Sequence, residues 1–273
     1  MMSTLPQKIL FVNSEIYPYL PESQPALIGR YLPQGIQEKK KEIRIFMPRF
    51  GCINERRNQL HEVIRLSGMN IIISDVDRPL VIKVASIAAA RIQVYFIDND
   101  DYFHRKAVYT GADGGFFPDN DERAIFFARG VLETAKKLRW SPDVIHCGGW
   151  FSQLVPAYLK KAYKGDPIFS GAKVVLSLYG DTPAAGFSNA FADKVPFGGL
   201  TREDLLLGDA PTGIELAKTA IKYSDGIILG APDVPEELVG MARDLGLPIL
   251  PYRAESIEDK SYIDEYNAFY EQL

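Results

Sequence analysis

Cysteine is scarce in this sequence: the 273 residues include only Cys52 and Cys147. Two distant cysteines exclude a disulfide framework and a CxxC metal site, and they leave open a single bridge between them. Charge of one sign is not in excess either, since 31 basic residues stand against 35 acidic ones and the formal net charge is -4. This balance gives no support for binding to nucleic acid or to an anionic membrane, and we expect neither partner.

Long apolar segments are also missing. No run approaches the ~20 residues that a membrane-spanning helix needs. Residues 1–15 show no apolar stretch with a small-residue cleavage site, so we expect no signal peptide. Together with the two isolated thiols, these features predict a cytoplasmic protein. We expect no metal site and no cofactor.

Short, β-branched apolar runs alternate with stretches of helical periodicity. The runs are typical of strands buried on both faces, and they occupy residues 9–12, 43–46, 144–145, 174–176 and 227–229. Helices are predicted at residues 121–139, 211–223 and 235–245. This alternation predicts an α/β fold with a Rossmann-like, doubly wound and mostly parallel sheet.

One region breaks the alternation. Residues 63–98 contain four apolar runs, at 63–66, 71–73, 81–84 and 92–96, with no helix-length segment between them. We interpret this region as an antiparallel β-hairpin insertion. The predicted organisation is one Rossmann-like domain, residues 1–255, with a C-terminal helix, residues 256–273, packed on it. We expect a natural short protein.

Ligands of open α/β sheets bind beyond the carboxyl ends of the strands, so the turns there are the candidate sites. The first turn, residues 13–25, holds three prolines and no glycine, and the next glycine is Gly29. Prolines lack the N–H donor that a phosphate-binding turn uses, which argues against a dinucleotide site and favours a rigid connection.

A second candidate site follows the strand at residues 144–145. His146 precedes Cys147 and two glycines, Gly148 and Gly149, which leave the backbone uncovered before Trp150. Two interpretations stay open at this point. The turn faces a ligand, or it is a tight connection whose histidine bonds within the scaffold.

Asp119 and Asn120 form the third candidate. Both residue types cap helices well, and a helix is predicted to start here, so capping is the default role.

The ordered set of motifs resembles the N-terminal half of bacterial glycogen synthases and plant starch synthases. These are retaining glucosyltransferases that use ADP-glucose. The matching stretches are residues 8–15, 43–50, 94–98, 102–105, Tyr109, 119–123, 140–147 and 149–150.

The resemblance implies half of a GT-B fold, in which the α-1,4-glucan acceptor lies mostly on this domain and ADP-glucose mostly on a second one. It implies a substrate-binding set of His146, Gly148, Gly149, Asp119 and Asn120. It assigns no catalytic residue.

The sequence departs from the family where the donor binds. Pro21 stands where the family has a lysine, Ser23 and Gln24 where it has two glycines, and Gly148 where it has a second histidine. Glucosyl transfer depends on placed charges that stabilise the leaving diphosphate. The resemblance therefore predicts a glucosyltransferase homologue that is inactive alone or depends on a protein partner or a second copy. The alternative is a non-catalytic glucan-binding or regulatory protein of glycogen metabolism.

Overall fold

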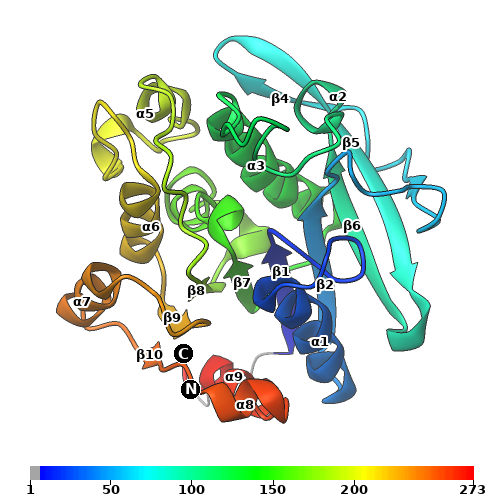
Figure 1. The fold of residues 1–273 in the computed structure, drawn as a ribbon, viewed down its shortest axis with the longest axis vertical. Coiled ribbons are helices and arrows are strands. Elements are labelled where there is room, and N and C mark those ends of the chain that lie inside the picture. The colour runs from blue at the N-terminus through cyan, green and yellow to red at the C-terminus, as the bar shows by residue number, and fades with distance from the viewer. Residues whose placement is uncertain (1–6) are drawn as a thin grey trace.

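The computed structural model describes residues 7–273 (Figure 1). Residues 1–6, part of the segment assessed for a signal peptide, lie outside the described residues. Within the described part, no helix is long and apolar enough to cross a bilayer. Cys52 and Cys147 are free thiols, so the bridge that the sequence left open does not form.

A mostly parallel sheet forms the centre of the molecule. Its parallel strands are β1 (Lys8–Asn13), β2 (Glu42–Pro48), β6 (Ile92–Asp98), β7 (Val144–Gly148), β8 (Lys173–Leu178), β9 (Gly226–Leu229) and β10 (Ile249–Leu250). The antiparallel strands are β3 (His61–Glu62), β4 (Met69–Ile73) and β5 (Val76–Ile87). The order across the sheet is β10-β9-β8-β7-β1-β2-β6-β5-β3, with β4 beside β5.

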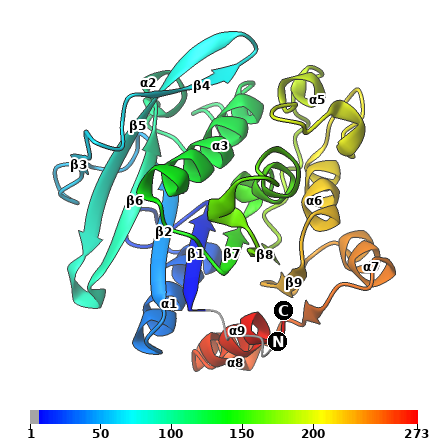
Figure 2. The same cartoon turned by 180° about the vertical axis from the view of Figure 1, so that it is seen from behind.

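Helices cover both faces of the sheet, as the continuous apolar strands require. The four apolar residues 9–12 of β1 are each 0% exposed. Helix α1 (Gln24–Glu38) and helix α9 (Tyr262–Glu271) contact each other on one face, and α3 (Asn120–Leu138) covers β2 and β6 on the other (Figure 2). Gly130 allows α3 to approach closely, because a Cβ there would lie 2.9 Å from Ile97 Cγ2.

The remaining helices are short or lie at the β9–β10 side of the sheet. They are α2 (Asp100–Phe103), α4 (Val155–Ala157), α5 (Phe191–Lys194), α6 (Gly213–Lys222), α7 (Glu236–Asp244) and α8 (Ala254–Glu258). The predicted helices at 121–139, 211–223 and 235–245 correspond to α3, α6 and α7.

The antiparallel insertion and the C-terminal helix are confirmed, with two corrections. Residues 63–66, predicted as a strand, form a turn after β3. The single terminal helix is two helices, because Lys260 between α8 and α9 adopts a left-handed conformation with φ 64°. Helix α9 still packs on the sheet through the buried side chains of Tyr262, Tyr266, Phe269 and Tyr270.

Candidate functional site

The carboxyl ends of β1, β7, β8 and β9 meet at one edge of the sheet. The chain proceeds outward from β1 to β2 on one side and from β7 to β8 and β9 on the other, so the strand order reverses between β1 and β7. Such a reversal is where open α/β sheets bind their ligands. We call residues 13–15, 148–150, 179–181 and 230–233, which end or follow these strands, the carboxyl edge.

The two predicted glycines lie at the carboxyl edge, and both are needed for close approach. A Cβ on Gly148 would lie 2.8 Å from Asn13 Oδ1, and one on Gly149 would lie 2.5 Å from Ser14 Oγ. Gly149 also has φ 84°, which disfavours any other residue. The Ser14 N–H donates to the Gly148 carbonyl over 2.9 Å and so joins the ends of β1 and β7. Close packing explains why glycines occupy these two positions. Contact of Gly148 and Gly149 with a ligand stays a prediction.

Asp181 is a carboxyl-edge group that the sequence analysis did not select. Its Oδ2 accepts the Trp150 N–H over 2.8 Å. The pKa of this carboxyl is raised from its usual 3.8 to about 6: burial is the largest cause, the nearby carboxylates of Glu15 and Asp233 add to it, and the Trp150 N–H acts against it. A buried acid titrating near neutral pH at a strand end is typical of functional sites.

Tyr109 brings an aromatic ring and a hydroxyl to the same place. Its ring centroid lies 4.9 Å from that of Trp150. Burial raises the pKa of its hydroxyl well above 10, and the next largest causes are the charges of Glu15 and Asp181. The Tyr109 hydroxyl therefore faces the carboxyl edge, together with two carboxylates.

Asn120 bonds to Tyr109, and its neighbour Asp119 pairs with an arginine. Asn120 is fully buried, donates from Nδ2 to the Tyr109 carbonyl over 2.8 Å, and accepts from the buried Arg123 guanidinium. Asp119 occupies the N-cap position of α3 without a side-chain cap bond, because its carboxylate pairs with Arg105 at 2.6 Å. Asp119 is therefore the N-cap residue, as predicted, but its side chain forms no capping hydrogen bond.

Replacement of Asn120 by Ala is expected to lower the free energy of unfolding by about 2 kcal/mol, because buried donors and acceptors lose their partner. Urea unfolding measures the change. Asn70 is exposed, and Asn70→Ala is the matched control, with an expected change below about 0.5 kcal/mol. Equal effects of the two substitutions would contradict the supporting role of Asn120.

Both ring nitrogens of His146 form hydrogen bonds with side chains of the protein itself. It is 1% exposed within β7, with Nδ1 2.5 Å from Tyr270 Oη of α9 and Nε2 2.7 Å from Ser177 Oγ of β8. Burial lowers the pKa of the imidazole from 6.5 to about 3, so the ring is neutral. Of the two interpretations left open, this geometry favours the structural one, and the predicted ligand contact has no support from it.

The sequence offered a weak signal for the residues it missed. Asp181 is the third residue after β8 and follows Gly180, so it lies in the turn at the carboxyl end of a buried apolar strand, as Gly149 does after β7. Tyr109 sits in a long connection with no periodicity, so its place at the carboxyl edge depends on tertiary contacts.

Comparison with known proteins agrees with this geometry. Residues 8–247 match the family described as starch synthase catalytic domain. The chain is 33% identical over 243 residues to a glycogen synthase of Chlorobium limicola, covering 87% of this chain and 48% of the relative. A glycogen synthase of Chlorobium luteolum is 35% identical, covering 83% and 48%.

A solved structure shares the fold. The catalytic domain of starch synthase IV from Arabidopsis thaliana, bound to ADP and acarbose, superposes with a TM-score of 0.69 at 17% identity, covering 93% of this chain and 52% of that one. The chain therefore spans about half the length of the relatives it matches.

Proposed function

Because the chain belongs to the family of starch synthase catalytic domains, we propose that it is the acceptor-side half of an ADP-glucose-dependent glucosyltransferase. In this proposal the carboxyl edge binds an α-1,4-glucan, and glucose transfer requires a second half supplied by a partner. The proposal includes a cytoplasmic location, which the free thiols of Cys52 and Cys147 support.

The observation that carries the proposal is the charge of the carboxyl edge. Asp181 is flanked by Glu15 and Asp233, and their negative charges already raise its pKa. A nucleoside diphosphate leaving group brings further negative charge, which these carboxylates repel. The cations that such a transfer needs must therefore come from outside this edge.

The same groups suit a neutral carbohydrate. Carboxylates accept hydrogen bonds from sugar hydroxyls, and the partly exposed ring of Tyr109, which packs on the buried Trp150, offers apolar surface beside them. The similar starch synthase IV structure has acarbose, a carbohydrate, bound together with ADP, which supports a glucan as the ligand here.

Transfer of labelled glucose from ADP-glucose to glycogen tests the catalytic half of the proposal. We expect no incorporation by the purified chain alone, and incorporation once a cell extract supplies the second half. Incorporation by the chain alone would contradict partner dependence. Failure of every extract, with glucan binding intact, would favour the non-catalytic glucan-binding alternative.

Electrophoresis in glycogen-containing gels tests the proposed binding of glucan. We expect retarded migration, and we expect Tyr109→Ala to weaken retention by about fivefold to tenfold through loss of aromatic contact. Tyr223 is partly buried between the end of α6 and the amino end of β9, at the opposite end of the strands from the carboxyl edge, and Tyr223→Ala is the control that should keep full retention. Unretarded migration of the folded wild type would exclude the proposed glucan site.

A further inference from the structure

A hollow of about 280 Å³ lies where the end of β6 meets β5 and α2, and Figures 1 and 2 show α2 beside β5. Glu62 of β3 pairs with Lys83 of β5. Val81 of β5 pairs with Asp98 of β6. Directly opposed residues of antiparallel strands, and alternate residues along one strand, project from the same face. The register therefore brings these four side chains together on one face, with Pro79 next to them in the lining.

Four charged groups at this place neutralise one another. The Asp98 Oδ2 atom lies 3.0 Å from Arg49 Nε and 2.9 Å from Lys83 Nζ. The Glu55 Oε1 atom lies 2.7 Å from the same ammonium and 3.3 Å from the same Nε atom. Two cations thus face two carboxylates, and the group as a whole has no net charge.

Two further carboxylates line the hollow without a cation of their own. Glu62 is exposed and has no ion pair among residues 7–273. The Asp100 side chain is 89% exposed, and Arg49 Nη2, already shared with two other carboxylates, lies 3.6 Å from it. Asp101 is also in the lining, but Arg78 pairs with it at 2.7 Å. The hollow therefore carries an excess of negative charge from Glu62 and Asp100.

One buried oxygen of the lining lacks a hydrogen-bond donor. Asp98 is only 2% exposed, and its Oδ1 atom has no partner in the described part of the chain. Its other oxygen holds both Arg49 and Lys83. Buried acceptors almost always have a donor, because leaving one unpaired is costly. A ligand that donates a hydrogen bond here would supply the missing partner.

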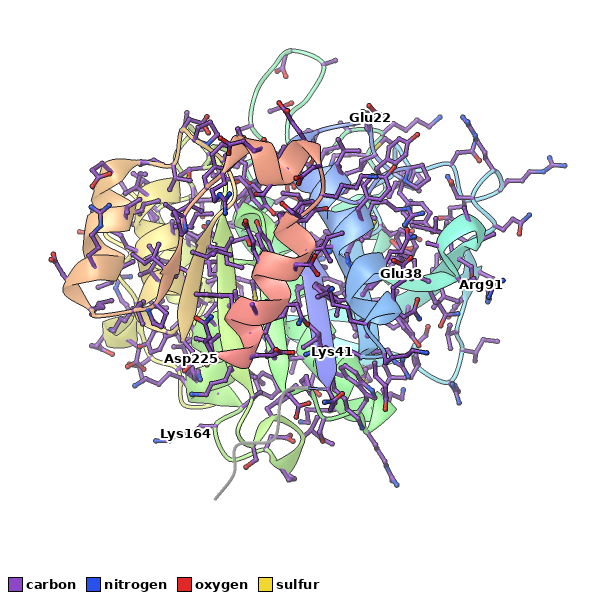
Figure 3. All side chains as sticks on the ribbon, turned by 90° about the horizontal axis from the view of Figure 1, so that it is seen from below. Glu22, Glu38, Lys41, Arg91, Lys164 and Asp225 are labelled. Atoms are coloured by element: carbon purple, nitrogen blue, oxygen red, sulfur yellow. The ribbon has the colours of Figure 1, made fainter. Side chains whose placement is uncertain are left out.

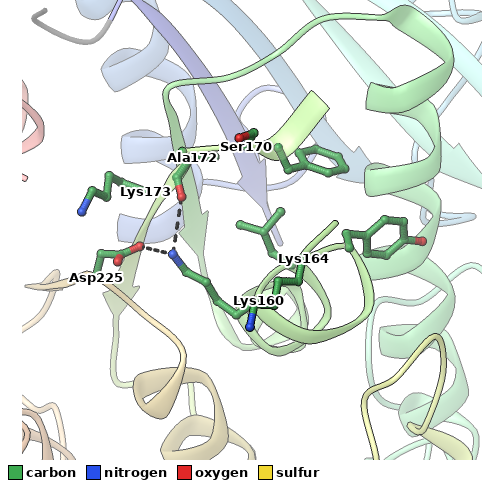
Figure 4. A pocket seen from close by; sticks show the side chains of 10 residues that line it. Lys160, Lys164, Ser170, Ala172, Lys173 and Asp225 are labelled. Carbon is green, nitrogen blue, oxygen red and sulfur yellow. Dashed lines mark hydrogen bonds and ion pairs between the residues drawn. The ribbon is translucent and has the colours of Figure 1, made fainter. Parts of the chain in front are cut away.

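A larger hollow, of about 320 Å³, lies beside the amino ends of β8 and β9 and shows the contrast (Figure 4). Figure 3 shows two of its residues, Lys164 and Asp225. In Figure 4 the Lys160 ammonium points at the Asp225 carboxylate, 2.7 Å away, and at the Ala172 carbonyl. The charged groups at its centre satisfy one another, so this hollow points to no ligand.

The chemistry around Asp98 favours an organic cation. No three acidic, histidine or cysteine side chains among residues 7–273 are placed to hold a metal ion. An ammonium group brings both the positive charge and the N–H donor that the hollow lacks. Pro79 and Val81 provide an apolar wall for a short alkyl chain.

We propose that this hollow binds a short aliphatic diamine in its doubly protonated form. One ammonium donates to Asp98 Oδ1, and the alkyl chain lies against Pro79 and Val81. The second ammonium pairs with the exposed carboxylates of Glu62 and Asp100, so the two charges of the ligand balance the excess charge of the site. This site does not depend on the carboxyl edge or on the activity proposed there.

Isothermal titration calorimetry of the full chain at low salt tests the proposal, with 1,4-diaminobutane, n-butylamine and 1,4-butanediol as separate probes. We expect saturable binding of diaminobutane that weakens as salt is added. Butylamine has one ammonium and is expected to bind at least about tenfold more weakly. Butanediol has the same length and no charge, and it is expected not to bind.

The double variant Glu62→Gln/Asp100→Asn is expected to bind diaminobutane at least about tenfold more weakly, because the charge-assisted contacts of one ammonium are lost. Asp244 and Glu258 are exposed acids at the ends of α7 and α8. Asp244→Asn/Glu258→Gln has the same change of net charge, and this matched control is expected to bind as the wild type does. Val81→Phe, which fills the hollow without changing charge, is expected to abolish binding.

Absence of saturable diaminobutane binding would overturn the proposal. Equal affinities for diaminobutane and for either of the other two probes would also overturn it, because two charged contacts would then not be used. Full binding by the Glu62/Asp100 variant would place the diamine on another acidic surface, and equal weakening in the Asp244/Glu258 control would show that net charge alone acts. Both results would contradict a site in this hollow.

Discussion

Replacement of Asp181 by Asn is expected to stabilise the protein by about 3 kcal/mol at pH 7.5 and by much less at pH 4. The pKa of this buried carboxyl is about 6 in the folded state against a usual 3.8. The stability that the protonated carboxyl provides is therefore fully present below pH 3.8 and is lost as the pH rises through about 6. Asn never ionises and avoids that loss.

The substitution keeps the local geometry. Asn retains an oxygen that accepts the Trp150 N–H, and its amide group donates toward the carboxylates of Glu15 and Asp233. The pH dependence is thus the diagnostic quantity, because any packing change acts equally at both pH values.

Urea unfolding at pH 4.0 and 7.5 measures the effect. The difference between Asp181→Asn and the wild type should be larger at pH 7.5 by about 2 kcal/mol. Asp77 is exposed, and Asp77→Asn should change stability by less than about 0.5 kcal/mol at either pH. A gain for Asp181→Asn that does not depend on pH would show that its carboxyl titrates normally.

The sequence predicts the location of the candidate site better than its chemistry. Strands β1, β7, β8 and β9 are recognisable as apolar runs, and parallel strands place their carboxyl ends together, so Gly148 and Gly149 could be located in advance. These positions follow from local patterns.

Contacts between distant segments were not predictable in the same way. The bond from Trp150 to Asp181 joins residues 31 apart, and the contact of His146 with Tyr270 joins residues 124 apart. A histidine before a glycine turn has the same local sequence whether it faces solvent or a helix. His146 faces a helix because α9 covers β7. The docking of α9 depends on Gly226, where a Cβ would lie 2.9 Å from the Phe269 ring.

His146 and Asp181 act on stability in opposite directions. The pKa of the buried imidazole is about 3 in the folded state against 6.5 when exposed, so the folded state resists its protonation. His146 therefore favours the folded state fully above pH 6.5, and this contribution is lost as the pH falls toward 3. Between pH 7.5 and 4.5 its loss and the gain from Asp181 are each about 2–3 kcal/mol and nearly cancel.

Replacement of His146 by Gln is expected to leave the contribution of Asp181 as the main pH-dependent part of the free energy of unfolding. At pH 7.5 the variant should be less stable than the wild type by about 1–3 kcal/mol, because Tyr270 and Ser177 lose part of their hydrogen bonding. At pH 4.5 this deficit should disappear, since acidification removes the His146 contribution from the wild type and the variant has no imidazole to protonate; the gain from Asp181 is the same in both proteins, so the variant alone becomes more stable as the pH falls.

The matched control is His104→Gln, at an exposed histidine, which should follow the wild-type profile at both pH values. The double variant His146→Gln/Asp181→Asn should lose both opposing contributions and return to a flat profile. A constant deficit of His146→Gln from pH 7.5 to 4.5 would mean that the buried imidazole protonates as readily as an exposed one. The enclosure of His146 by α9 would then not govern its ionisation.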